Sequence, residues 1–213
     1  MDLQRQRYRT NSNKERQTTE APILRLPPAK IALYFFLTSI TIFFFTFTVL
    51  YFFAQNLWTW TQFKFPKVFI ISTFVLIASS YTISEAVKAF KTENSKRLQQ
   101  MLWLSLILSI VFVAAQVWGW VILYDLGIYI DGKPDGSYLY LLSGLHALHV
   151  IVGVVILAFM IGKIHLKLQD SVDQLVYFTD SGQLMKLEMI ATYWHFVDGL
   201  WLYLLFFLLF NHL

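Results

Sequence analysis

Five ionisable side chains lie inside the long apolar stretches of the C-terminal half of this sequence: His146, His149, Glu188, His195 and Asp198. Imidazoles and carboxylates can ligate a haem or a metal, carry protons, or hydrogen bond to one another. A carboxylate at the centre of a membrane helix costs roughly 2.5–3.5 kcal/mol, so such a residue normally faces a bundle interior and has a partner. The chemistry of these five residues therefore depends on what faces them.

Helical spacing places the five on two stripes. The first stripe consists of Glu188, Thr192, His195 and Asp198. The second consists of Gly144, His146, His149 and Gly153, where the small residues allow a neighbouring helix to approach closely. His149 and Asp198 are both near the middle of their apolar stretches, so they have about the same depth. We expect the two stripes to face each other and to satisfy one another's hydrogen bonds.

The spacing leaves three roles open for these residues. They can form a buried structural network, they can bind a lipid headgroup or conduct protons, or they can ligate a haem or metal. A bis-histidine haem needs one imidazole from each of two helices at matching depth, whereas His149 and His195 differ by about four residues in height.

Weaker polar features lie in the middle of the chain. Glu85 can reach Lys88 on its own helix face, which is typical of an acid at the membrane interface. Gln116, in AAQVWGW, is expected to donate a hydrogen bond to another helix. The hydroxyl groups of ASSYTISEA (78–86) are expected to bond to backbone carbonyls or to side chains of other helices.

The composition indicates which solvent surrounds these residues. The chain has 213 residues, of which 57% are hydrophobic and only 14% are charged, whereas soluble domains carry roughly 25% charged residues. Lipid is therefore the expected solvent.

The sequence contains no cysteine, which excludes disulfides, iron–sulfur clusters, thiolate zinc sites and thiol nucleophiles. Nothing in it resembles a phosphate loop or a two-carboxylate site.

Five apolar stretches predict five membrane-spanning helices, because about 20 apolar residues cross a bilayer and only helices satisfy the backbone at this length. The predicted spans are 31–54, 67–90, 100–124, 138–162 and 187–211. The fold class is therefore an all-α polytopic bundle, with a polar basic tail over 1–30 and a membrane domain over 31–213.

Lysine and arginine positions predict the orientation. Fourteen of the 17 lie in the N-terminal tail, in or after the last turn of the second span, or between the fourth and fifth spans, and the other three are Lys64, Lys67 and Lys133. This bias places the N-terminus in the cytoplasm and the C-terminus outside, with Trp58 and Trp60 in an outer aromatic belt. It also explains the net charge of +4, so we expect no nucleic-acid partner.

Two sequence blocks resemble a known family. SGLHALHVIVGVVIL (143–157) is similar to the Gly-x-His-x-x-His-Val-x-x-Gly signature of subunit III of the haem-copper terminal oxidases, including cytochrome c oxidase. EMIATYWHFVDGLWL (188–202) is similar to that family's Glu-x4-Tyr-Trp-His-Phe-Val-Asp-x-x-Trp signature. Both blocks occur in the family's order, and the resemblance extends over roughly residues 31–211.

The resemblance implies a short, five-helix bacterial form of subunit III, in the bacterial inner (plasma) membrane. It implies no haem, copper or catalytic centre in this chain, because these belong to subunits I and II. The expected partners are those two subunits and membrane lipids, with bound phospholipid and a larger respiratory supercomplex as further associations. The implied role is support of electron transfer from cytochrome c to dioxygen, coupled to proton pumping, by packing on subunit I and holding lipid.

Two positions depart from the family pattern, and two other functions stay open. Ile40 follows Ser39 where the family commonly has an acid, and Gly119 stands where many members have Glu. The absence of these two acids argues against any role in proton uptake or lipid gating that depends on them. A quinol oxidase subunit III, or a freestanding haem-binding membrane oxidoreductase, are the alternative functions.

Overall fold

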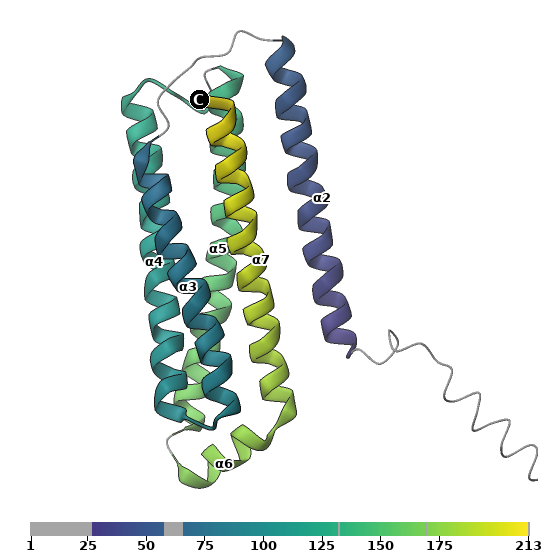
Figure 1. The fold of residues 1–213 in the computed structure, drawn as a ribbon, viewed down its shortest axis with the longest axis vertical. Helices are drawn as coiled ribbons and strands as arrows, with labels where there is room; N and C mark the ends of the chain where they lie inside the picture. Colours follow the sequence, from purple (N-terminus) through teal and green to yellow (C-terminus); the bar gives the residue numbers. More distant parts are fainter. Residues whose placement is uncertain (1–26, 58–65, 132, 169, 213) are drawn as a thin grey trace, which may run out of the picture. The chain divides into compact units, whose positions relative to one another are not determined.

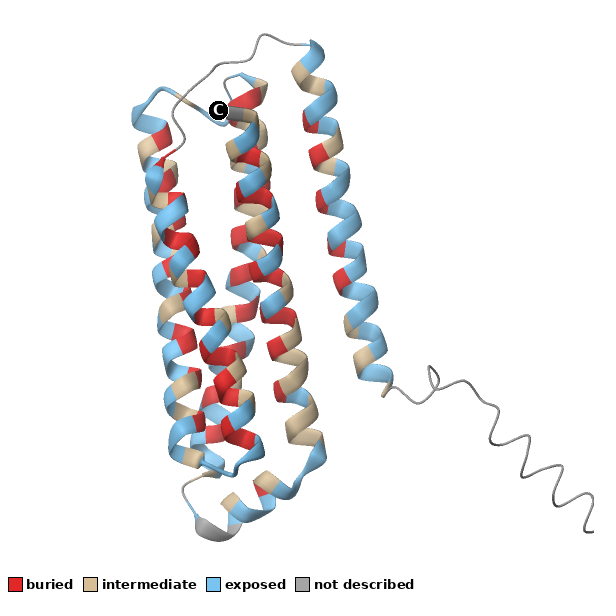
Figure 2. Ribbon diagram, in the orientation of Figure 1, coloured by how far each residue is buried: buried red, intermediate tan, exposed pale blue. Residues whose placement is uncertain are grey.

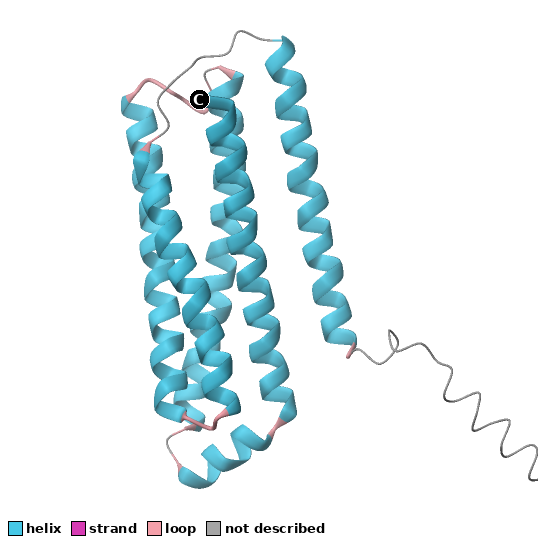
Figure 3. Ribbon diagram, viewed as in Figure 1, coloured by secondary structure: helices cyan, strands magenta, loops and turns pink. Residues whose placement is uncertain are grey.

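The computed structural model describes residues 27–57, 66–131, 133–168 and 170–212. All regular structure in these ranges is helical (Figure 3), which confirms the all-α prediction. The helices are α2 (Pro28–Leu57), α3 (Lys67–Lys91), α4 (Ser95–Asp125), α5 (Pro134–Lys167), α6 (Ser171–Thr179) and α7 (Ser181–His212). Most of the predicted tail, together with Trp58 and Trp60 of the predicted aromatic belt, lies outside the described residues.

Five of the described helices are long and apolar enough to cross a membrane, as predicted. Most extend past the predicted ends, because helix-forming polar residues continue them beyond the apolar stretch. The helix α7, for example, begins at Ser181 rather than at residue 187. The nine-residue α6 was not predicted, since a short helix between two spans has too few apolar repeats to be recognised.

The chain divides into two units, residues 1–36 and residues 37–213. In the first unit the described residues from 28 onward form the first turns of α2. In the second unit α3, α4, α5 and α7 pack in a ring, each against the next and α7 against α3 (Figure 1). Successive helices of this ring run in opposite directions, which brings their midpoints to a common depth.

Buried residues of the four-helix ring line its interior (Figure 2). The core is formed by large apolar side chains such as Leu76, Ile83, Leu102, Leu142 and Trp201, all less than 4% exposed. Other large apolar side chains, including Phe74 and Phe159, are more than two-thirds exposed. An apolar outer surface of this kind suits a bundle whose solvent is lipid.

The second part of α2 contacts α5 and α7 through aromatic side chains. The ring of Tyr51 lies edge-on to Tyr138, with centroids 5.7 Å apart, and to Phe207, with centroids 5.0 Å apart. The hydroxyl groups of Thr48 and Tyr203 are hydrogen bonded at 2.8 Å. Aromatic rings thus fill the space that closer helix backbones would otherwise occupy.

Local sequence determines two of the turns between helices. Between α3 and α4, Glu93 adopts a left-handed φ of 53° and Asn94 caps α4 by accepting the Arg97 backbone N–H at 3.0 Å. After α4, Gly127 has a φ of 79°, a conformation that favours glycine. There the Ile128 N–H donates to the Leu123 carbonyl, which satisfies the end of the helix.

Asp180 caps the start of α7. Its carboxylate accepts the Gly182 backbone N–H at 2.8 Å and the Gln183 side-chain amide at 3.0 Å. These two hydrogen bonds, the first contributing most, lower the pKa of the Asp180 carboxyl.

In α6, burial raises the pKa of the Tyr177 phenol to about 12, with a further contribution from the Asp180 charge.

Candidate functional site

A ladder of hydroxyl groups joins α3 to α4 inside the ring. The Thr82 and Ser105 hydroxyl groups lie 2.6 Å apart, and those of Ser79 and Ser109 lie 3.3 Å apart. The Ser109 hydroxyl also donates to the Ser105 carbonyl at 2.6 Å. All four residues are buried, so the ladder holds two apolar helices together through hydrogen bonds that are shielded from the membrane and from bulk solvent.

Two indoles of α7 extend this ladder. The Trp194 Nε1 donates to Ser79 Oγ at 3.0 Å, and the Trp201 Nε1 donates to Thr73 Oγ1, also at 3.0 Å. Because Trp194 and Trp201 are seven residues apart, they lie on one face of α7, which is the face toward α3. The apolar bulk of each ring fills the core while its N–H is satisfied.

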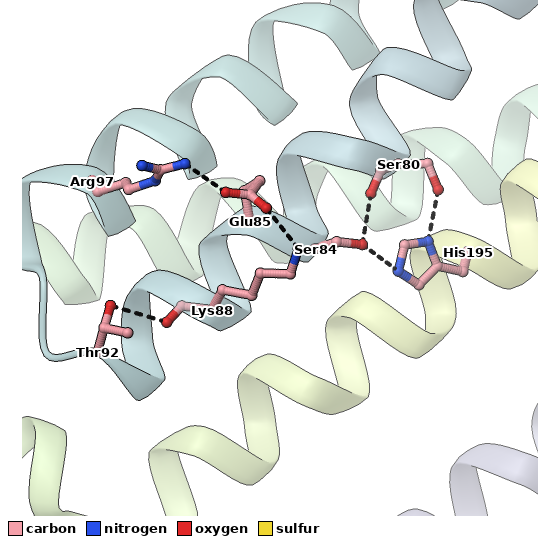
Figure 4. Close-up of polar contacts among 7 residues, drawn as sticks. All are labelled: Ser80, Ser84, Glu85, Lys88, Thr92, Arg97 and His195. Carbon is pink, nitrogen blue, oxygen red and sulfur yellow. Dashed lines mark hydrogen bonds and ion pairs between the residues drawn. The ribbon is translucent and has the colours of Figure 1, made fainter.

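His195 points to α3, not to α5 as predicted (Figure 4). Its Nδ1 lies 2.6 Å from Ser80 Oγ, and its Nε2 lies 3.1 Å from Ser84 Oγ. The Ser84 hydroxyl donates to the Ser80 carbonyl. Its oxygen therefore accepts from Nε2–H, and Nδ1 accepts from Ser80. The ring is exposed on the outer side of the α3–α7 contact, yet both nitrogens are satisfied.

Asp198 lies one turn further along α7 and is 7% exposed. Its carboxyl interacts with the Ser80 side chain, again on α3. Its Oδ2 is fully enclosed and has no hydrogen-bond partner among the described residues. The predicted pairing of this carboxyl with the polar stripe of the preceding span is therefore wrong. Sequence spacing does not fix how α7 is rotated about its own axis. In the structure, α7 is rotated so that these polar groups point to α3.

The polar stripe of α5 does contact α7, but mostly through aromatic rings. His146 is fully buried, with its ring centroid 5.0 Å from that of Trp201, and neither ring nitrogen has a partner in the described part of the chain. The Nδ1 of His149 is 2.7 Å from the Leu145 carbonyl of its own helix. Across the contact, the Tyr193 hydroxyl donates to the His149 carbonyl at 2.8 Å.

Two glutamates form ion pairs near the common end of α3 and α7. Glu85 pairs with Lys88 at 2.8 Å, as predicted, and also with Arg97 of α4 at 2.6 Å (Figure 4). Glu188 pairs with Lys91 of α3 at 3.0 Å. Glu188 was predicted to belong to the stripe facing α5, but this ion pair is with α3. Both acids therefore tie neighbouring helices together where the chain leaves the apolar layer.

The remaining sequence predictions concern Gln116, Gly119 and Ile40. Gln116 donates from Nε2 to Ser72 Oγ at 3.2 Å, which confirms the predicted interhelical hydrogen bond. A Cβ built on Gly119 would lie 2.4 Å from the Phe69 ring, so this ring occupies the space of a side chain. Ile40 is 5% exposed and belongs to the apolar core.

Sequence reasoning missed several members of the network. The hydroxyl groups of Ser105 and Ser109 lie one helical turn apart in an otherwise apolar stretch, and this spacing is a usable signal. The indole donors Trp194 and Trp201 gave no such signal, because tryptophan also occurs at membrane interfaces, where its N–H meets lipid headgroups or water. Among the described residues, no three His, Asp or Glu side chains are placed to hold a metal ion.

Comparison with known proteins identifies the family. The family described as cytochrome c oxidase subunit III matches residues 27–212. The chain belongs to the cytochrome c oxidase subunit III family. Cytochrome c oxidase subunit 3 of Scyliorhinus canicula is 32% identical over 138 residues, which is 65% of this chain and 48% of that protein. The corresponding protein of Patiria pectinifera is 30% identical over 135 residues, 63% of this chain and 47% of that protein.

The chain thus spans about half the length of the curated relatives it matches. The two sequence blocks that resemble subunit III lie on α5 and α7. Both contribute to one packed contact, where a Cβ on Gly153 would lie 2.8 Å from Trp194 and 3.0 Å from Tyr193. The family resemblance and the helix packing therefore concern the same residues.

Proposed function

We propose that this chain is a non-redox subunit III of a cytochrome c oxidase, which acts through partner subunits that hold the haem and copper. The observation that carries the proposal is the family match over residues 27–212, which includes all five of the membrane-length helices in the described residues. The chain supports electron transfer from cytochrome c to dioxygen, and the proton pumping coupled to it, by packing on subunit I.

We further propose that the chain lies in a bacterial inner membrane with its N-terminus in the cytoplasm. The bias of lysine and arginine supports this orientation. The ion pairs of Glu85 and Glu188 lie at the end of the bundle that this bias places on the cytoplasmic side. Residues 1–30 form a basic cytoplasmic tail in this proposal.

The intramembrane polar network has a structural role in this proposal. Every hydrogen bond described for His195, Trp194 and Gln116 joins two helices of the ring. Side-chain hydrogen bonds of this kind contribute roughly 0.6 kcal/mol each in membrane bundles. Together they fix the packing of α4 and α7 on α3, and a partner subunit requires such a fixed surface in order to dock.

A groove between α4 and α5 supports a role in holding lipid. It has a volume of about 350 Å³ and lies where α4 ends and α5 begins. Its walls are mostly apolar and aromatic and contain one acid; they include Val117, Val121, Tyr124, Tyr129, Ile130 and Asp131. We propose that a phospholipid acyl chain occupies this groove, with the cationic part of its headgroup near Asp131 and the rings of Tyr124 and Tyr129.

Affinity purification of the full chain from its native membrane tests the complex. We expect haem-copper subunits I and II to co-purify, together with cytochrome c oxidase activity and a haem absorption band. The chain expressed alone is expected to show no such band. A Soret band in the isolated chain would instead support a freestanding haem protein. If the complex oxidised quinol but not cytochrome c, quinol would be the electron donor.

Lipid in the groove can be tested separately by mass spectrometry of lipids retained in the purified complex. Val121→Trp fills the groove and is expected to lower the retained phospholipid. Val111→Trp places the same side chain at a position 47% exposed on the same helix but outside the groove, and should leave the retained phospholipid unchanged. Equal retention in both variants would contradict the lipid site.

A further inference from the structure

A small cavity lies between the four helices of the ring at the level of Asp198. Its volume is about 10 Å³, which is close to the room that one water molecule needs. Most of its wall is apolar or aromatic, including Leu76, Phe112 and Val197. Three side chains, Ser79, Ser109 and Asp198, bring hydroxyl or carboxyl groups to it from three different helices.

One of these polar groups lacks a partner. The Asp198 Oδ2 is fully enclosed and accepts no hydrogen bond from the described residues. A buried acceptor left unsatisfied costs roughly 1–3 kcal/mol, and such groups in native proteins are commonly satisfied by an internal water. The position of Asp198 on the cavity wall makes the cavity the place where a donor can reach it.

All but one of the protein hydrogen-bond donors around the cavity already have an acceptor other than Asp198. The Trp194 Nε1–H donates to Ser79 Oγ, and the Tyr193 hydroxyl donates to the His149 carbonyl. The Ser109 hydroxyl donates to the Ser105 carbonyl at 2.6 Å. The Ser79 hydroxyl is the exception: its nearest acceptors, Ser109 Oγ and the Ser105 carbonyl, are 3.3 and 3.5 Å away, which is long for O–H···O.

We propose that this cavity is a binding site for a single internal water molecule. The water accepts the Ser79 hydroxyl proton and donates its two protons to Asp198 Oδ2 and Ser109 Oγ. Three hydrogen bonds are the usual number for a buried water, and they supply the donor that Oδ2 lacks. The water joins α3, α4 and α7 at one point, a role beyond the subunit function proposed above.

Radiolytic labelling of the purified full-chain complex tests this site. Hydroxyl radicals formed from an internal water modify the side chains beside it, even where bulk solvent has no access. We expect Trp194 and Tyr193 to be labelled several times faster than Trp201. Trp201 is the matched control: it is on the same helix, it is also buried, and it does not line the cavity. Labelling of Trp194 as slow as that of Trp201 would overturn the proposal.

A second measurement keeps the proposal testable if labelling is confounded by partner subunits. A structure of the complex at a resolution that shows ordered waters is expected to contain one peak within hydrogen-bond distance of Ser79, Ser109 and Asp198. Ser109→Ala should weaken the peak, whereas Ser72→Ala, a buried serine of α3 outside the cavity, should not. Direct contact between Asp198 Oδ2 and a serine hydroxyl, with no peak between them, would refute the water site.

Discussion

The Nδ1 of His195 lies 2.6 Å from the hydroxyl of Ser80, and this contact joins α7 to α3. The second ring nitrogen is 3.1 Å from Ser84 Oγ, on the next turn of the same helix. An imidazole that is exposed on the outer face of an apolar bundle would be costly if its nitrogens were unpaired. The two serines, four residues apart, remove that cost by meeting both nitrogens.

The coupling between His195 and Ser84 can be measured directly. We expect His195→Ala to lower the free energy of unfolding in detergent by about 1 kcal/mol, because hydrogen bonds of this kind contribute about 0.6 and at most about 1.7 kcal/mol. A double-mutant cycle with Ser84→Ala should give a coupling energy within that range. A coupling energy near zero would mean that the contact does not stabilise the bundle.

The contact of α5 with α7 depends on the absence of a side chain at Gly153. A Cβ there would lie 2.8 Å from Trp194 and 3.0 Å from Tyr193. Gly153→Ala is therefore expected to lower the free energy of unfolding by about 1–3 kcal/mol through overpacking. Gly144→Ala is the control, because a Cβ at that position of α5 has no neighbour within 4 Å. Equal stability of the two variants would show that α7 moves aside freely.

The Phe69 ring occupies the space that a side chain at Gly119 would need. Since a Cβ at Gly119 would lie 2.4 Å from this ring, Gly119→Glu should lower the yield of folded protein and its thermal midpoint. Phe69→Ala in the same chain should restore part of the loss by making room for the carboxylate. If Gly119→Glu alone is as stable as the parent, the glycine is not explained by packing.

Acid stability should depend on Asp180. The pKa of this carboxyl is lower in the folded chain because Gly182 and Gln183 donate hydrogen bonds to it. The carboxylate therefore contributes stability above its unfolded pKa, and this contribution is lost as the pH falls through the lower, folded pKa. Thermal midpoints of Asp180→Asn, which can still cap α7, should fall less between pH 6 and pH 3 than those of the parent. Parallel pH profiles would contradict the capping role.

Apolar length and charge patterning were sufficient to predict the helices, because membrane helices obey constraints that act on each segment by itself. The partners of the polar residues were predicted less well. His195 and Asp198 were assigned to α5 from sequence adjacency, but α7 closes the ring by packing on α3 as well. The rotation of a helix about its axis depends on the fit of bulky rings such as Trp194 and Trp201, which a 3.6-residue period does not encode.

Two substitutions of Asp198 can show whether the bundle needs this buried acid for its hydrogen bonds or for its charge. Asp198→Asn keeps a polar group of nearly the same size against Ser79, Ser109 and Ser80, so assembly of the complex should be largely retained. Asp198→Leu removes the carboxyl that contacts the Ser80 side chain and the proposed internal water, and the loss of these polar contacts is expected to cost about 1–3 kcal/mol. We expect a clear loss of this chain from the purified complex. Normal assembly and turnover of Asp198→Leu would mean that the buried carboxyl has no structural partner, and failure of Asp198→Asn would mean that its charge is required.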